Sequence, residues 1–287
     1  MSTMMGWHLP DRVLRLDGRA LVMGVVNVTP DSFSDGGQFA TTNAAVDHAL
    51  QLVSQGADIL DVGGESSRPG AAPVAADEEL RRVLPVVSVL AARVPVPISV
   101  DTTKAAVADA CLAAGAHIVN DITALRGDPD MARVAAARGA GVVLMHMQGT
   151  PQTMQLDPRY DDVAAEVCRF LDERLYAAVT AGIDAGRVVL DPGIGFGKKS
   201  GHNLELLARL GELRALGRPV LLGVSRKGFF GRLLGRDVSE RLAASLAAVC
   251  HAVALGTAQL VRVHDVRETR DAVTLLEAIR ERARAVQ

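Results

Sequence analysis

Polar side chains directly follow eight short β-branched segments of this sequence, a pattern that could assemble one ligand site. In chain order they are Asn27, Asp61, Asp101, Asn120, His146, Asp191, the tripeptide Ser225-Arg226-Lys227, and Arg262 with His264. A single carboxylate at such a place could simply cap the helix that follows it. Eight polar segment ends out of eight are harder to explain by capping, so we interpret the set as functional.

The chemistry of these side chains divides the expected site into two parts. Asp101, Asn120 and Asp191 offer donors and acceptors suited to the edge of a flat heterocycle. A carboxylate such as Asp191 can accept two parallel hydrogen bonds from an amidine-like N–C–N group. The positive charge comes from the last two segments, with Lys227, Arg262 and His264. We therefore predict a polar floor beside an anion-binding rim.

Two long loops that contain glycine and proline follow the first two β-branched segments. They cover 29–37 and 63–70. Loops of this length on a rigid scaffold are more often binding lids than plain connections. A third glycine-rich segment, 191–198, contains GxGxG without the full dinucleotide fingerprint, so it is weak evidence for a nucleotide.

The segments that must position these residues alternate between two patterns. Short runs without polar alternation, as expected of strands buried on both faces, occupy 20–26, 59–62, 98–100, 118–120, 141–144, 188–190, 220–224 and 260–263. Helical apolar stripes occupy 44–55, 77–93, 104–114, 129–138, 163–181, 204–216, 239–255 and 266–285. The alternation predicts an α/β fold, a single (β/α)8 TIM barrel whose strand ends share one catalytic face. An open, doubly wound sheet is the alternative.

The composition limits the partners of the protein. We expect one domain over 1–287, with 1–18 as an extension before the first strand, because no linker-like stretch divides the chain. Lys and Arg number 31 against 33 Asp and Glu, so there is no global positive field for nucleic acid or an anionic membrane. With neither an export signal nor an apolar stretch of membrane-spanning length, we expect a cytoplasmic location.

Motifs across nearly the whole chain, in order, resemble those of the dihydropteroate synthase family. They are NVTPDSFSDGG (27–37), DVGGESSRPG (61–70), SVDT (99–102), NDI (120–122), DPGIGFGK (191–198), SRK (225–227) and RVHD (262–265). The resemblance implies an enzyme of folate biosynthesis that joins 4-aminobenzoate to (7,8-dihydropterin-6-yl)methyl diphosphate, giving 7,8-dihydropteroate and diphosphate. It also implies a target of sulfonamides.

The resemblance implies a role for individual residues as well. It assigns the pterin to Asp101, Asn120, Met145, Asp191, Gly223 and Lys227. It assigns the diphosphate to Asn27, Ser67, Arg262 and His264, with Mg²⁺ bridging it to Asn27. It assigns 4-aminobenzoate to Ser66, Arg68, Pro69, Phe196, Ser225 and Lys227. The residues implied in catalysis are then Asp101, Lys227, Arg262 and His264.

Other functions fit part of this pattern. A pterin-dependent methyltransferase barrel would share the pterin-facing Asp and Asn residues but has no need for the anion-binding rim. A paralogue that binds pterin diphosphate without synthase activity would keep the same motifs. The resemblance also suggests a homodimer through the later barrel helices, and the Ala-rich face of 243–255 permits close packing. Sensitivity to sulfonamides stays open.

Overall fold

Eight parallel strands form a barrel in the described residues, which are 5–16, 19–29 and 37–285 of this computed structural model. They are β3 (Leu21–Asn27), β4 (Ile59–Gly63), β5 (Ile98–Asp101), β6 (Ile118–Asp121), β7 (Gly141–Met145), β8 (Val188–Asp191), β9 (Leu221–Leu222) and β10 (Leu260–Val263). Their order is β8-β7-β6-β5-β4-β3-β10-β9, and a parallel bridge between Leu190 and Val220 joins the two ends. The predicted TIM barrel is confirmed, and the open sheet is wrong.

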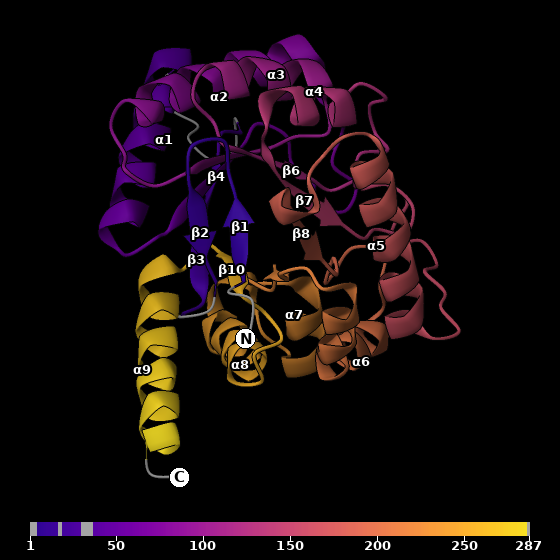
Figure 1. Cartoon of the computed structure of the whole chain (residues 1–287). Coiled ribbons are helices and arrows are strands. Elements are labelled where there is room, and N and C mark those ends of the chain that lie inside the picture. Colours follow the sequence, from indigo (N-terminus) through magenta and orange to yellow (C-terminus); the bar gives the residue numbers. More distant parts are fainter. Residues whose placement is uncertain (1–4, 17–18, 30–36, 286–287) are drawn as a thin grey trace.

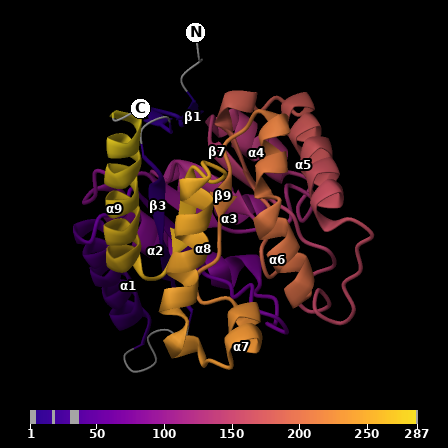
Figure 2. The same ribbon diagram turned by 90° about the horizontal axis from the view of Figure 1, so that it is seen from below.

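Helices surround the strands (Figures 1 and 2). They are α1 (Gly37–Ser54), α2 (Ala76–Ala91), α3 (Ala105–Ala113), α4 (Met131–Arg138), α5 (Val163–Thr180), α6 (Ser200–Ala208), α7 (Gly228–Leu234), α8 (Leu242–Ala254) and α9 (Val266–Ala285). Short 3₁₀ helices are η2 (Ala185–Arg187), η3 (Leu210–Leu216) and η4 (Val238–Glu240). Within the described ranges, no helix is long and apolar enough to cross a membrane.

Several element boundaries differ from those expected. Helix α1 begins before the expected 44–55, and β9 is shorter than the expected 220–224. The expected helix 204–216 is divided into α6 and η3, and the expected helix 239–255 into η4 and α8. The sequence pattern does not predict α7, because seven residues that include two glycines are too few to show a helical period.

The two faces of each barrel strand meet different surroundings. Outward residues such as Leu60 and Val62 belong to the large apolar core shared with the helices. Inward residues such as Met23 and Ile59 form a second apolar core. Toward the carboxyl ends of the strands, the next inward residues are register partners in the sheet. Asp61 pairs with Ser99, Gly63 with Asp101, and Asp101 with Asn120. A polar layer therefore follows the apolar interior along the barrel axis.

A hairpin closes the amino end of the barrel. Strands β1 (Gly6–His8) and β2 (Val13–Arg15) pair antiparallel, and Figure 1 shows them across the barrel strands. Trp7 is fully buried in the inward apolar core, and its indole Nε1 donates to the carbonyl of Arg187 at 2.7 Å. The described part of the extension expected before the first strand is therefore a plug for the barrel.

Candidate active site

A pocket at the carboxyl ends of the strands brings together most residues expected to bind ligands. Of the expected residues, it is lined by Ser67, Asp101, Asn120, Met145, Asp191, Phe196, Gly223, Lys227 and Arg262. Ile122, Gly193 and Ile194 complete the lining. Sequence reasoning missed these three because apolar side chains and glycine carry no chemical signal. Their only signal is that each lies within three residues of a polar strand end.

Arg262 is held between two carboxylates in this pocket. Its Nε donates to Asp61 Oδ2 at 2.6 Å, and its Nη2 donates to Asp101 Oδ2 at 2.7 Å. Asn120 Nδ2 also donates to Asp61 Oδ2, at 3.1 Å. Asp61 is fully buried, so it organises both a pterin-side residue and the expected anion ligand. The sequence marked Asp61 as a polar strand end but gave it no role.

Burial raises the pKa of two carboxyl groups in the pocket. Burial raises the pKa of Asp101 to about 7, with Arg262 acting against the shift and Asp61 adding to it. Burial also raises the pKa of Asp191, while the N–H of Gly193, 2.7 Å from Asp191 Oδ1, lowers it. Burial therefore disfavours the charged form of both carboxyl groups, and a hydrogen-bond donor or a cation on a ligand would favour it again.

Lys227 lies against an aromatic ring at the edge of the pocket. Its Nζ is 4.2 Å from the centroid of the Phe196 ring, a cation–π distance. Burial lowers the pKa of Lys227 to about 8, and the nearby Asp191 carboxylate opposes that shift. This pair combines a positive charge with a flat apolar surface, as a planar aromatic acid would require.

Ser225 and His264 contact each other beside the pocket but do not line it. The Nδ1 of His264 lies 3.0 Å from Ser225 Oγ, which also accepts from the backbone N–H of His264 at 3.2 Å. Burial, followed by the charge of Arg262, lowers the pKa of His264 to about 4. Burial therefore favours the neutral imidazole at His264, whereas an anion bound beside it would favour the charged form.

The loop after β4 reaches the pocket at one residue only. Ser67 lines the pocket, whereas Arg68 and Pro69 are exposed and Ser66 is half-buried outside it. The start of the loop is fixed by an ion pair between Glu65 and Lys104. The other loop that we expect to act as a lid covers residues 29–37. Of these, residues 30–36 lie outside the described part of the structure.

His146 does not join the pocket, although it follows β7 as a polar strand end. It is buried, and its Nδ1 lies 2.9 Å from Nζ of the fully buried Lys198. Burial lowers the pKa of His146 to about 2 and that of Lys198 to about 7. Lys198 of this buried pair contacts backbone carbonyls of the glycine-rich loop after β8. The sequence pattern does not predict a role for either residue of the pair.

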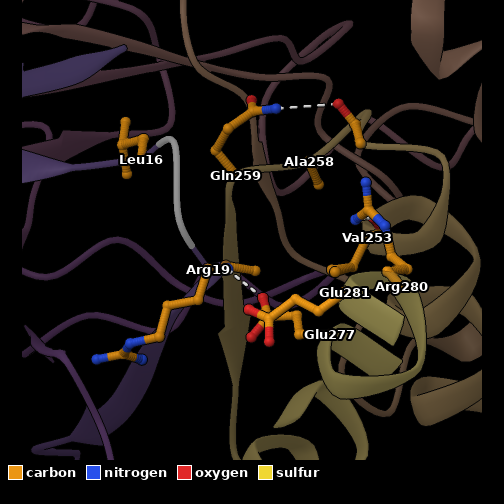
Figure 3. A pocket seen from close by; sticks show the side chains of 10 residues that line it. Leu16, Arg19, Val253, Ala258, Gln259, Glu277, Arg280 and Glu281 are labelled. Carbon is orange, nitrogen blue, oxygen red and sulfur yellow. Dashed lines mark hydrogen bonds between the residues drawn. The ribbon is translucent and has the colours of Figure 1, made fainter. Parts of the chain in front are cut away.

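A second hollow lies at the opposite end of the barrel, beside the segment before β3 (Figure 3). Its lining includes Glu277 and Arg280 of α9, but both are bonded to backbone groups. Glu277 Oε1 accepts from the N–H of Ala20 at 2.6 Å, and Arg280 Nη1 donates to the carbonyl of Val253 at 2.7 Å. The carboxyl-end pocket is therefore the candidate active site.

Known proteins are similar to this chain in sequence and in fold. Residues 23–264 match the family of pterin binding enzymes. The dihydropteroate synthase of Escherichia coli (strain K12) is 51% identical over 257 residues, which cover 90% of each chain. The solved structure of the Xanthomonas albilineans dihydropteroate synthase with 4-aminobenzoic acid is 50% identical, with a TM-score of 0.90 over 97% of this chain and 99% of that chain.

A Yersinia pestis dihydropteroate synthase structure with a sulfonamide drug complex is also similar. It is 46% identical to this chain, with a TM-score of 0.91 over 96% of this chain and 100% of that chain. Both solved structures therefore match nearly the whole barrel and not one motif alone. The chain belongs to the pterin-binding enzymes, as a member of the dihydropteroate synthase family.

Proposed function

We propose that this chain is a transferase of folate biosynthesis that condenses 4-aminobenzoate with (7,8-dihydropterin-6-yl)methyl diphosphate. The products are 7,8-dihydropteroate and diphosphate. One observation carries the proposal: a single pocket holds heterocycle-binding groups and cations together, namely Asp101, Asn120, Asp191, Lys227 and Arg262. A methyltransferase barrel would have no use for cations in that pocket.

The pterin ring is assigned to the floor of the pocket. Asp191 Oδ1 is held by the N–H of Gly193, while its Oδ2 lies beside Gly223, where no side chain blocks a flat ring. Asn120 is buried at the same floor and Met145 provides an apolar wall. Together with Asp101 and Lys227, these groups match the donors and acceptors of a pterin edge.

The diphosphate is assigned to Asn27, Ser67, Arg262 and His264, with Mg²⁺ held by Asn27. The described residues contain no group of three or more His, Cys, Asp or Glu that could hold a metal alone. A single amide oxygen at the end of β3 suits Mg²⁺, which usually keeps waters and takes phosphate oxygens as its other ligands. When bound, the ion would neutralise charge on the departing diphosphate.

The arylamine is assigned to the rim, with Ser66, Arg68, Pro69, Phe196, Ser225 and Lys227 around it. Phe196 and Lys227 are already in contact, so they form the fixed part of this subsite. Arg68 and Pro69 are exposed, so the proposal requires the loop after β4 to move over the pocket. Such a closure would keep water from capturing the reactive pterin.

Catalysis in this proposal is electrostatic. The dihydropterin ring supplies electron density as the methylene carbon–oxygen bond breaks and diphosphate leaves. The arylamine nitrogen then attacks that carbon and releases one of its protons to solvent, which gives the neutral secondary amine. Arg262 stabilises the leaving diphosphate, and Asp101, ionised, stabilises the cationic pterin. Arg262 already lies between Asp61 and Asp101, so its guanidinium is positioned before the substrate arrives. This mechanism needs no covalent intermediate between enzyme and substrate. The alternative role for Lys227 is that of a lysine that forms a Schiff base.

The test is to mix the purified protein with the pterin diphosphate, 4-aminobenzoate and Mg²⁺ while following diphosphate release and dihydropteroate formation. The proposal predicts product only when all three components are present, and inhibition by a sulfonamide if the arylamine subsite is drug-sensitive. Tight binding of the pterin diphosphate with no product would identify a binding paralogue instead.

A homodimer through α8 and α9 is also proposed. Leu255, at the end of α8, and Leu275 and Ile279 of α9 are large apolar side chains that are 52%, 64% and 58% exposed. A second copy of the chain packed against these helices would remove such side chains from water. The single-domain organisation over 1–287 and the cytoplasmic location stay predictions.

A further inference from the structure

The glycine-rich loop after β8 carries Phe196 but receives little support from the sheet. Strand β9, its neighbour, has only Leu221 and Leu222 in the ladder with β10. A single bridge, Leu190 with Val220, joins β8 to it. The conformation of this loop must therefore depend on contacts other than strand pairing.

A buried lysine supplies such contacts. Lys198 is fully buried, and its Nζ lies 2.9 Å from the carbonyl oxygen of Gly193 and 3.0 Å from that of Phe196. Its third neighbour is His146 Nδ1, at 2.9 Å. Three neighbours satisfy the hydrogen-bonding capacity of an ammonium group, so no position is left for a substrate.

The backbone of this loop is unusual and is held at several places. Asn203 and Tyr160 hold Gly195 and Gly197, while Lys198 holds Gly193 and Phe196. Gly193, Gly195 and Gly197 all have positive φ angles, of 66°, 86° and 59°. Glycine permits such angles but gives no side chain to hold them. A Cβ at Gly193 would lie 1.8 Å from the carbonyl oxygen of His146, so the loop also passes directly against the residue that contacts Lys198.

From this arrangement we infer that Lys198 is a positioning residue that, with His146, fixes the Phe196 ring beneath Lys227 and so builds the arylamine subsite. The inference rests on the proposed function, which assigns that subsite to Phe196 and Lys227. Lys198 also reaches the pterin side, because Gly193, whose carbonyl it holds, donates its N–H to Asp191 Oδ1. Asp191 itself lies within β8, where Met145 is its partner in the ladder, so its backbone does not depend on Lys198 and the effect on the pterin should be the smaller one.

The test compares Lys198→Met with Lys199→Met in steady-state kinetics of the condensation reaction. Methionine keeps most of the length of the side chain and removes the three contacts of Nζ. We expect KM for 4-aminobenzoate to rise about tenfold in Lys198→Met, while KM for the pterin diphosphate changes less than about threefold. Lys199 is exposed and its Nζ contacts Asp157 at 3.0 Å, so Lys199→Met should match the unsubstituted protein.

Substitution of His146 keeps the inference testable if Lys198→Met does not fold. His146→Asn retains a side-chain acceptor and should keep KM for 4-aminobenzoate within about twofold, whereas His146→Leu removes it and should raise that KM about threefold. Unchanged KM values in Lys198→Met, or equal rises for both substrates, would overturn the inference. Absence of product with the unsubstituted protein would instead contradict the proposed function.

Discussion

The two ends of the barrel use charged residues in opposite ways. At the amino end, charges fasten backbone and neighbouring side chains together. Asp58 accepts from the N–H of Val22 at 2.8 Å and pairs with Arg19. Glu277 accepts from the N–H of Ala20, and Figure 3 shows this contact beside a hollow. These charges hold the segment before β3 and helix α9 on the barrel.

At the carboxyl end, charges face one another across an open pocket. Arg262 is shared by Asp61 and Asp101, while Lys227 lies against an aromatic ring near Asp191. The pKa values of Asp101 and Lys227 shift to about 7 and 8, which reflects burial that protein contacts offset only in part. One end of the barrel therefore stabilises the fold, and the other keeps its charges for a ligand.

Replacing Trp7, the buried residue of the plug, should cause the largest loss of stability and leave the catalytic rate nearly unchanged. Trp7→Ala deletes a fully buried indole and its hydrogen bond to Arg187, so we expect a loss of about 3–5 kcal/mol in the free energy of unfolding. Denaturant titration measures that loss. Below the unfolding transition, kcat per folded molecule should stay within about twofold. A large fall in kcat of the folded protein would show that the two ends are not separate.

Removing the shared guanidinium should have the largest effect on activity. Arg262→Ala should lose about 2–4 kcal/mol of transition-state stabilisation, or roughly thirtyfold to a thousandfold in kcat/KM. The matched control is Arg19→Ala at the amino end, where the side chain is half exposed and should change kcat/KM less than about twofold. An effect below tenfold for Arg262→Ala would move the diphosphate elsewhere.

A smaller effect is expected from Asp191, the carboxylate that is assigned to the pterin ring. Asp191→Asn replaces an acceptor oxygen with a donor that faces another donor, so pterin affinity should fall by about 1–3 kcal/mol. Calorimetric titration with a stable pterin ligand measures this change. Asp58→Asn at the amino end provides the control, because it should lower stability and leave that affinity unaltered. An unchanged affinity in Asp191→Asn would contradict the assignment of the ring.

The smallest effect is a shift in pH dependence. Asp101 must be ionised to stabilise the cationic pterin, so kcat/KM should fall as the pH falls through about 7. The negative charge of Asp61 raises the pKa of Asp101, so Asp61→Asn should move this acid limb to lower pH. A limb that stays in place, or moves to higher pH, would show that Asp61 does not act on Asp101 in this way.

Sequence pattern predicts this site well where the chemistry follows strand order. Asp101, Asn120 and Asp191 end buried runs, and parallel strands in a barrel must bring such ends to one face. The roles of Asp61 and Lys198 could not be predicted in the same way. Asp61 contacts Arg262 from 201 positions away, and Lys198 contacts His146 from 52 positions away. Whether two such side chains meet depends on the packing of the whole barrel.

The plug shows the same limit at the level of fold. Strands β1 and β2 have three residues each, which is too short to establish a period of two. Trp7 is buried only because the barrel interior provides apolar partners such as Met23 and Ile59. An element stabilised almost entirely by its partners leaves little local signal in the sequence.

The most direct test of the account is a structure of the protein with a bound pterin, such as 7,8-dihydropteroate. We expect the ring in the carboxyl-end pocket, with its N–C–N edge at Asp191 and its other polar atoms at Asp101 and Asn120. The hollow beside Glu277 should stay without ligand. A ring bound at that amino-end hollow, or outside both, would contradict the division of roles between the two ends of the barrel.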